Sequence, residues 1–487
     1  MRLRYLGLVL AATVGCSRLP AVGPDYNPPE PPAITGWVNI DTVGDSPSGA
    51  QSVWWSGFHD PKLVELIEAG LLGNLELKRA ESRLREARAA RRIAAAGFLP
   101  SVGAYGEYVR RDPSDTASES PFGPAGTDLR SNYDVGFDAG WEIDIFGGTR
   151  REYEAATAEI EGSAAFRDGV RISLASEVAR EYGALRSLEQ RIAIAEQSIG
   201  IQRESLEIID ARFRAGVSSE LDLAQARTEL ETTRARVPAL RTELAATRYR
   251  LGILIGATVE EIDARIGGGA GPVVGAPLIP VYPSINAVNT PSEVLRRRPD
   301  IQRAERELAA ATARIGVAAA DLFPQFDLSG AFGFVSGKTA ELFKTESRSW
   351  SFIPGIRWPI FNGGKLLAAV QIANERERQA FARYEENVLR AIAECESAFV
   401  AYREEQVRQE ALRSALRASE RALVLARDLY AQGVVDFLRV IDAERSNFLR
   451  ADDVAQSEQA LMNSIIAIYK ALGGSPVISS NEPARAP

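Results

Sequence analysis

A unit of roughly 220 residues occurs twice in this chain of 487 residues, which is too long for a solenoid repeat. Residues 141–148 (WEIDIFGG) recur as residues 358–364 (WPIFNGG), and residues 213–217 (FRAGV) recur as residues 430–434 (YAQGV). In each copy, a helical pattern ends in a Leu-Pro or Phe-Pro pair just before an alternating segment. The sequence therefore predicts two related halves, and the function is to be sought in what these halves build together.

The scarcity of histidine and cysteine excludes several kinds of site. His59 is the only histidine, and Cys395 is the only cysteine besides Cys16. A disulfide framework within one mature chain is therefore excluded, and a His/Cys metal site has almost no ligands. The net charge of -8 argues against a nucleic-acid partner, because phosphate neutralisation needs a concentrated basic face. We expect no metal, no cofactor and no catalytic residues, since a plausible nucleophile and base are lacking.

Residues 1–15 have the pattern of an export signal. Arg2 and Arg4 give a positive start, residues 6–14 give an apolar core, and a small residue precedes Cys16. Cys16 followed by serine is typical of a bacterial lipoprotein junction, in which the cysteine is acylated and becomes the mature N-terminus. Thr13 stands where such junctions usually carry leucine, so ordinary signal cleavage nearby is the alternative.

Four segments alternate between apolar and polar positions as strands do: residues 101–110, 133–145, 325–335 and 350–360. In the second segment, the polar positions include Asp134, Asp138, Glu142 and Asp144. Each segment is near the length of about 9 to 11 residues that a tilted transmembrane strand needs. A soluble sheet with one buried face is the alternative. No segment after the signal approaches the about 20 consecutive apolar residues of a membrane helix, so any entry into a membrane must use strands.

Four strands cannot close a barrel, because even small barrels need about eight. An open strand edge cannot be left in lipid. A membrane location therefore predicts an oligomer in which each chain contributes a sector. The polar row with Asp134, Asp138, Glu142 and Asp144 would then line an acidic lumen.

Long helices outweigh these strands. Residues 148–256 contain one proline and residues 364–473 contain none, and both spans are rich in Ala, Leu, Glu, Arg and Gln. A glycine interrupts each span, which predicts two antiparallel helical hairpins. The first arm would be about 100 Å long and the return arm about 60 Å. Continuous helices expected at residues 62–96 and 291–320 would supply the missing length if each stacked end to end on a return arm. Narrow apolar stripes favour either a cylinder wall or a free-standing coiled coil.

Short motifs connect these elements, above all residues 22–26 (VGPDY) and residues 297–301 (RRPDI). With them, nearly the whole mature chain resembles the TolC-like outer-membrane factors, in particular the lipoprotein branch of efflux channels similar to OprM and NodT. The resemblance implies a mainly α protein with a membrane β part. Each chain would give two long helical hairpins to a periplasmic tunnel and four transmembrane strands, one third of a trimeric twelve-stranded barrel.

The resemblance also implies a function. The chain would be an outer-membrane channel that passively conducts small molecules such as drugs and toxic compounds. Implied partners are two further copies of the chain, a periplasmic adaptor protein, an inner-membrane pump of the RND type and outer-membrane lipid. The alternatives are the channel of a type I protein secretion system and a non-channel periplasmic adaptor, which would lack paired strands with aromatic outer faces.

The family places its hairpin tips where the adaptor docks. The matching positions here are Gly216, Val217, Ser218, Gly433 and Val434. A glycine at a tip permits positive φ and close backbone approach, so a side chain there should obstruct docking. The alternative is that both glycines only turn the chain.

The resemblance further suggests a closed aperture just inside the tips, gated by acids and their partners. The matching residues are Asp222, Tyr430, Arg439 and Asp442. Val435 stands where an arginine is often found, so an ion-pair lock would join Arg439 to Asp222 or to Asp442. The alternative is that these are solvated charges on helix faces.

These expectations divide the chain into six parts. They are a signal peptide (1–15), an N-terminal tether and extended segment (16–61), a first repeat (62–256), a linker (257–290), a second repeat (291–473) and a C-terminal tail (474–487).

Overall fold

The computed structural model describes residues 21–30, 36–42, 54–111, 130–266 and 287–474. The chain divides into two compact units, and each unit takes residues from both sequence repeats. The first unit comprises residues 1–29, 83–164 and 303–384, and the second unit comprises the remainder. Cys16 and the predicted signal peptide lie outside the described residues.

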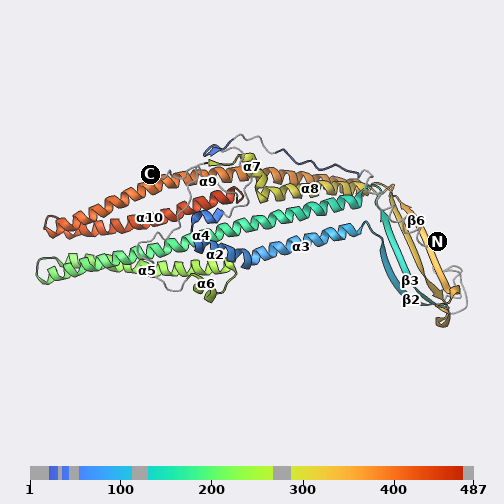
Figure 1. The fold of residues 1–487 in the computed structure, drawn as a ribbon, viewed down its shortest axis with the longest axis horizontal. Coiled ribbons are helices and arrows are strands. Elements are labelled where there is room, and N and C mark those ends of the chain that lie inside the picture. The colour runs from blue at the N-terminus through green and yellow to red at the C-terminus, as the bar shows by residue number, and fades with distance from the viewer. Residues whose placement is uncertain (1–20, 31–35, 43–53, 112–129, 267–286, 475–487) are drawn as a thin grey trace, which may run out of the picture. The chain divides into compact units, whose positions relative to one another are not determined.

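The first unit contains an antiparallel sheet whose strands lie side by side in Figure 1. Their order is β2 (Ser101–Arg111), β3 (Arg130–Ile143), β5 (Gln325–Ser336) and β6 (Arg348–Arg357). Each repeat supplies one antiparallel strand pair, and β3 joins the pairs by bonding to β5. The four predicted strands are confirmed. β6 ends at Arg357, before its predicted limit at residue 360.

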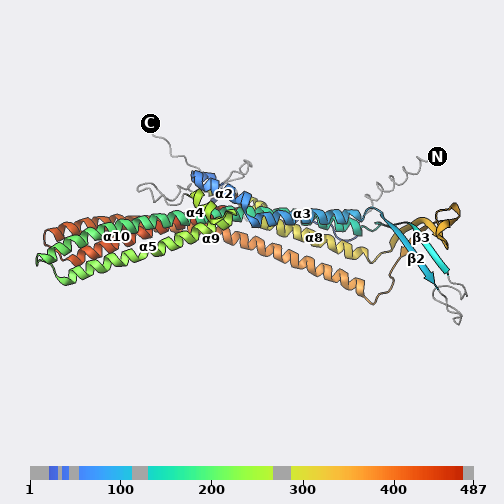
Figure 2. The same ribbon diagram turned by 90° about the horizontal axis from the view of Figure 1, so that it is seen from below.

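The second unit contains the turns of two helical hairpins. The first hairpin is α4 (Gly148–Arg214) with α5 (Glu220–Ile255), and the second is α9 (Lys365–Ala431) with α10 (Phe437–Ala471). Figure 2 shows α5 running back along α4 and α10 along α9. Both long helices have 67 residues, and the return helices have 36 and 35. The predicted hairpins with unequal arms are therefore confirmed.

The helix predicted before each strand pair is divided in two. The first consists of α2 (Pro61–Gly73) and α3 (Leu75–Ala96), which meet at Asn74. The second consists of α7 (Pro291–Arg297) and α8 (Pro299–Ala320), which meet at Arg298. The expectation of one continuous helix in each place is wrong. In the second case the cause is Pro299, which disfavours helical backbone in the residue before it. In the first case, the Asn74 side chain caps α3.

The core of the second unit packs α2 and a short helix before it against the long helices. Its fully buried side chains include Phe58, Leu63, Leu66, Ile67, Tyr182, Leu185, Leu251, Met462 and Ile465. The remaining elements are short: β1 (Asp41–Thr42) pairs in parallel with β4 (Ala287–Val288), α6 is Val259–Ile266, and the 3-10 helices η2, η3 and η4 are Trp54–Phe58, Thr339–Glu341 and Thr345–Ser347.

A helix that crosses a membrane needs about 20 predominantly apolar residues. Among these residues, no helix is both long enough and apolar enough to cross a membrane.

Candidate functional site

Two hairpin turns of the same design stand at the ends of α4 and α9. Gly216 and Gly433 both have φ +75°, a left-handed conformation that favours glycine. In the first turn, the N–H of Gly216 donates to the carbonyl of Phe213 (2.9 Å) and the N–H of Val217 to that of Arg212 (2.9 Å). The second turn repeats both bonds at Gly433 and Val434. This Schellman pattern satisfies the last carbonyls of each long helix.

The tips themselves are open. No heavy atom lies within 4 Å of the position that a Cβ would take at Gly216 or Gly433. The neighbouring Val217 and Val434 are 74% and 66% exposed. These exposed apolar side chains offer a contact surface at each turn. Among the described residues, only the backbone conformation accounts for a glycine at each tip.

Asp222, a predicted gate residue, caps α5 within the chain. Its carboxylate accepts hydrogen bonds from the N–H of Ser219 (3.1 Å) and from the hydroxyls of Ser219 (2.8 Å) and Ser218 (3.0 Å), while its own N–H donates to the Ser219 hydroxyl. This is a reciprocal capping box. Burial acts to raise the pKa of Asp222, but the bonds from Ser219 and Ser218 outweigh it and hold that pKa below its ordinary value.

The other predicted gate residues lie on the second hairpin. The ring of Tyr430 packs against Phe437 with centroids 5.4 Å apart, and the Arg212 guanidinium lies 4.7 Å from the Tyr430 centroid. Arg439 and Asp442 are exposed. Within the described part of the chain, no ion pair joins Arg439 to Asp442 or to Asp222. A lock through Arg439 therefore stays a prediction.

Sequence reasoning missed a buried ion pair close to these turns. The carboxylate of Glu444 on α10 accepts from Arg427 on α9 (2.8 Å) and from the Ser205 hydroxyl on α4 (2.6 Å). The Glu444 side chain is 3% exposed. Position 444 continues the buried series 437, 440, 441 and 448 of α10, so a carboxylate on an apolar stripe was the signal that could have found it. This group joins the two hairpins.

A second link between the hairpins lies beside the first. Arg445 of α10 donates to the carboxylate of Glu229 on α5 (2.8 Å), and Arg191 of α4 pairs with Asp452 of α10 (2.6 Å). The hydrogen bonds that Arg445 donates to Glu229 raise the pKa of Arg445. The charged residues near the tips are therefore partly structural, and they hold four helices in register.

The polar row of the sheet is present on β3. Glu142 lies opposite Asp327 of β5, and Asp134 lies opposite Glu107 of β2. Opposite Asp138 the sheet has Gly103, where a Cβ would stand 2.7 Å from the Asp138 carboxylate. The acids of neighbouring strands thus share one face. Arg357 supplies a counter-charge by pairing with Asp327 (3.0 Å).

The opposite face of the sheet is apolar. Phe137, Phe332 and Trp350 are direct neighbours across three strands. They are 61%, 49% and 71% exposed in the single chain. An exposed apolar patch of this kind on a regular sheet indicates contact with lipid or with another apolar surface.

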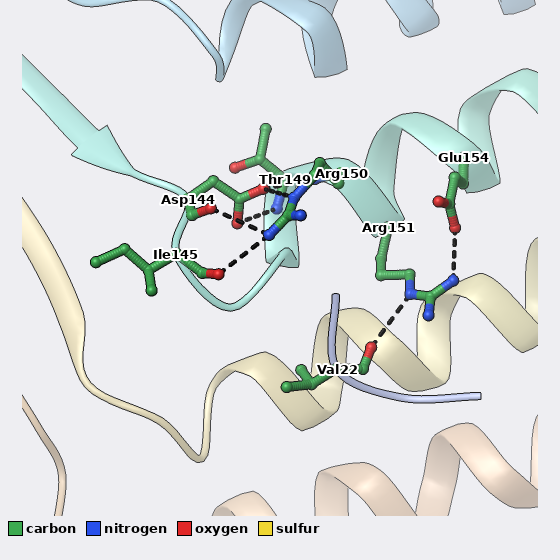
Figure 3. A network of polar contacts seen from close by, with 7 residues as sticks. All are labelled: Val22, Asp144, Ile145, Thr149, Arg150, Arg151 and Glu154. Carbon is green, nitrogen blue, oxygen red and sulfur yellow. Dashed lines mark hydrogen bonds and ion pairs between the residues drawn. The ribbon is translucent and has the colours of Figure 1, made fainter. Parts of the chain in front are cut away.

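Asp144 has a different place from the one predicted. It follows the end of β3, and it accepts from the N–H groups of Thr149 (3.2 Å) and Arg150 (3.0 Å) in the first turn of α4 (Figure 3). The first N–H groups of an α-helix need such acceptors from outside the helix. The Arg150 guanidinium also donates to the Ile145 carbonyl (3.1 Å). β3 therefore ends at Ile143, because Asp144 is used to cap α4 and does not extend the polar row.

The VGPDY motif fastens the N-terminal segment to α4 and α8. Arg151 is buried and donates to the Val22 carbonyl (3.1 Å) and to the Glu154 carboxylate (2.8 Å), as Figure 3 shows. It also pairs with Asp25 of the motif (2.7 Å). Gly23 has φ +90° and approaches the backbone of α8 so closely that a Cβ would lie 2.4 Å from a backbone carbon. The motif is thus a structural strap.

The described residues include His, Cys, Asp and Glu side chains, which are the usual ligands of metals such as zinc. No group of three or more His, Cys, Asp or Glu side chains among them is placed to hold a metal ion. Burial raises the pKa of the Cys395 thiol to about 11, so this thiol is protonated at neutral pH and is a poor nucleophile. The charged clusters serve helix ends, helix pairs and the polar face of the sheet.

Relatives match almost the whole chain. The family model described as outer membrane efflux protein matches residues 66–257 and 290–474. Outer membrane protein OprJ of Pseudomonas aeruginosa is 30% identical over 470 residues, which cover 96% of this chain and 95% of OprJ. The toluene efflux pump outer membrane protein TtgF of Pseudomonas putida is 30% identical over 485 residues, which cover 97% of each chain. The solved structure of the outer-membrane channel OprN has 35% identity and a TM-score of 0.82, covering 93% of this chain and 99% of OprN.

Proposed function

Because the chain belongs to the outer membrane efflux protein family, we propose how its sheet and hairpins form an export conduit. The chain is an outer-membrane efflux channel with a TolC-like fold, as the sequence predicted. Channels of this family act with an adaptor and an inner-membrane pump. The pump would supply the energy, and this chain would supply a passive path without any catalytic step.

The sheet carries this proposal. It has an exposed aromatic face, an acidic face and two strands, β2 and β6, that bond to one neighbour only among the described strands. Strand edges in lipid must find partners, because each unpaired backbone group there costs several kcal/mol. Three copies would close the edges by pairing β6 of one copy with β2 of the next. The aromatic face would meet lipid, and Asp134, Asp138 and Glu142 would line the lumen.

The helical hairpins would form the tunnel wall, with their turns toward the adaptor. The exposed turns at Gly216–Ser218 and Gly433–Val434 support this assignment, because each presents an apolar side chain beside a backbone with open space around it. Just inside the turns, Asp222, Tyr430, Arg439 and Asp442 would narrow the aperture. Arg439 and Asp442 are exposed in the single chain, so their partners would come from neighbouring copies.

The cargo would be small organic molecules, since TtgF is by name part of a toluene efflux pump. We propose an RND-type pump as the energy source. We also propose that Cys16 is acylated and anchors the mature N-terminus in the outer membrane. Mass spectrometry of the N-terminal peptide tests the anchor, because acylation adds the mass of the fatty acyl groups and ordinary cleavage adds none.

Electron microscopy of the detergent-extracted protein, together with conductance in planar bilayers, tests the conduit. We expect particles with threefold symmetry. After the protein inserts into the bilayer, we expect discrete current steps that persist under an applied voltage. A water-soluble monomer without conductance would overturn the proposal. Threefold particles without conductance would indicate a closed aperture, and variants of Asp222 and Asp442 would then have to restore current for the proposal to stand.

A further inference from the structure

The two divided helices have a common geometry that capping alone does not require. Asn74 ends α2 and starts α3, and Arg298 ends α7 and starts α8. Their backbones are nearly identical, with φ -60° and ψ 130° at Asn74 and φ -67° and ψ 123° at Arg298. Both are buried polar residues, 8% and 6% exposed. Each occupies the same place in its repeat, although their chemistry differs.

Asn74 uses both ends of its amide. Its Oδ1 accepts from the N–H groups of Glu76 (2.8 Å) and Leu77 (2.9 Å) in the first turn of α3. Its Nδ2 donates to the carbonyl of Leu254 (2.8 Å), one residue before the end of α5. One side chain therefore satisfies unpaired groups at the start of one helix and the end of another.

Arg298 makes the same kind of connection in the second repeat. Its Nη1 donates to the carbonyl of Ala471 (2.7 Å), the last residue of α10. Its Nε and Nη2 form a two-pronged bond to Asp300 in the first turn of α8 (3.0 and 2.7 Å). Nη2 also donates to Glu394 of α9 (2.7 Å). Burial acts to lower the pKa of Arg298, but bonds to Asp300 and Glu394 outweigh it and raise that pKa.

Left-handed glycines bring the helix ends together at both places. Gly256 follows α5 with φ +69°, and a Cβ there would lie 2.5 Å from the carbonyl oxygen of Gly73, next to Asn74. Gly473 follows α10 with φ +70°, and a Cβ there would lie 3.3 Å from the Cα of Arg298. Both return helices thus end directly against the residue that starts a pre-strand helix.

We propose that Asn74 and Arg298 are splice residues. Each ties the C-terminal end of a return helix, α5 or α10, to the N-terminal end of a pre-strand helix, α3 or α8, so that the two helices transmit displacement as one. The inference deepens the proposed function, on which its use rests. The effect of adaptor contact at a hairpin turn would then pass along two joined helices as it would along the continuous helices α4 and α9.

The competing explanation is local capping, in which Asn74 serves α3 alone. Asp at this position separates the two roles. An Asn74→Asp side chain keeps an acceptor for the amides of Glu76 and Leu77 and remains a good helix cap. It has no hydrogen to donate to Leu254, and its charge repels that carbonyl. Asn74→Asp should therefore break the splice and preserve the cap.

For Arg298 the matched pair is Arg298→Lys and Arg297→Lys. A lysine at 298 keeps the charge but lacks the planar fork that reaches Asp300, Glu394 and the Ala471 carbonyl together. Arg297, one residue earlier, pairs only with Glu293 of its own helix in the described chain. The same substitution there leaves the helix junction unchanged and serves as the control.

Distances between nitroxide labels, measured by pulsed electron paramagnetic resonance, test the splice in the full chain. Labels at Arg79→Cys and Ala246→Cys flank the first junction, and labels at Gln302→Cys and Gln456→Cys flank the second; all four positions are exposed. Cys395 is buried with a raised pKa and takes up little label. A Cys16→Ser background and dilution with unlabelled chain limit the signal to one pair of labels.

We expect narrow distance distributions in the wild type and in Arg297→Lys, and clearly broader ones in Asn74→Asp and Arg298→Lys. Hydrogen exchange at Glu76 and Leu77 should stay slow in Asn74→Asp, which shows that the cap is intact. A distribution in Asn74→Asp as narrow as the wild type would overturn the splice in favour of capping. Equal widths for Arg298→Lys and Arg297→Lys would overturn it in the second repeat. Neither readout involves transport, so these failures are distinct from a failure of the channel proposal.

Discussion

Substitution of the two tip glycines separates a docking role from a simple turn. Gly216 and Gly433 both have φ +75°, and no heavy atom lies within 4 Å of a Cβ built on either. A side chain at these positions therefore meets no clash with the described residues. Its only internal cost is backbone strain, which for alanine in a left-handed conformation is about 1–2 kcal/mol. Asparagine adopts this conformation more readily and often replaces glycine at helix ends.

The turn role and the docking role predict opposite orders of activity for the asparagine and alanine variants. A strain of about 1–2 kcal/mol reduces the population of the native turn relative to alternatives by about 5- to 30-fold, which is small against a whole hairpin. If the glycines only turn the chain, asparagine variants should work nearly as well as glycine, and alanine variants should work less well. If an adaptor approaches the tips closely, asparagine should be worse than alanine, because it places more atoms in the contact. We expect the second order at both tips.

Export is measured as ethidium accumulation in cells that depend on this chain, and assembly is measured by size-exclusion chromatography of the extracted protein. Gly200→Asn is the matched control, because Gly200 lies within α4, away from the turn, and also has no atom within 4 Å of a Cβ. It should export normally. Full export by the asparagine variants, combined with a loss in the alanine variants, would refute close docking at the tips. Loss of assembly in the asparagine variants would refute it as well.

The remaining predictions concern charges near the turns and in the sheet. Asp222→Ala should destabilise the first turn of α5 by about 1 kcal/mol, which should appear as faster hydrogen exchange in that turn. Because the pKa of Asp222 is lowered in the folded chain, its stabilising contribution is present above the ordinary pKa and is lost as the pH falls through the folded pKa. A difference in exchange between wild type and variant that did not shrink on acidification would contradict the capping box. Arg427→Met should cost about 2–3 kcal/mol, less than a fully buried pair because the Arg427 side chain is 35% exposed and Ser205 still donates. Adding Glu444→Leu to Arg427→Met should restore most of the thermal stability. Equal melting temperatures of the single and the double variant would exclude an uncompensated buried charge as the cause of the loss. Asp138→Arg should reduce cation preference in reversal-potential measurements, and an unchanged potential would place this row outside the lumen.

The architecture could be predicted from the sequence because each type of element has its own local hydrophobic period. Alternation over β3 and β5 separates the faces of the sheet, and a helical period over α4 and α9 sets the long arms. The duplication reinforces both readings, since each pattern occurs twice. Gly216 and Gly433 were found as turns because a left-handed helix end has few alternatives to glycine. These features depend on neighbours within a few residues of one another.

Some local signals of an element boundary were present in the sequence, but the surrounding pattern favoured a different assignment. Pro299 marks the division between α7 and α8, yet the apolar pattern around it continues. Asn74 in a helical stretch is ambiguous, because asparagine both tolerates helix surfaces and caps helix ends. Its assignment required the carbonyl of Leu254, which is 180 residues away in the sequence. Asp144 likewise continues the alternation of β3 and is used for α4 instead.

The sequence determined the two-repeat plan, the strands, the hairpins and the family, because hydrophobic periods and turn residues act over short distances along the chain. Only the tertiary structure decided which charged residues are buried partners. Glu444 and Asp442 lie two positions apart on α10, but one is buried against Arg427 and Ser205 and the other is exposed. A carboxylate becomes structural when another helix brings a cation and a hydroxyl to it, and that meeting is fixed by the packing of distant segments.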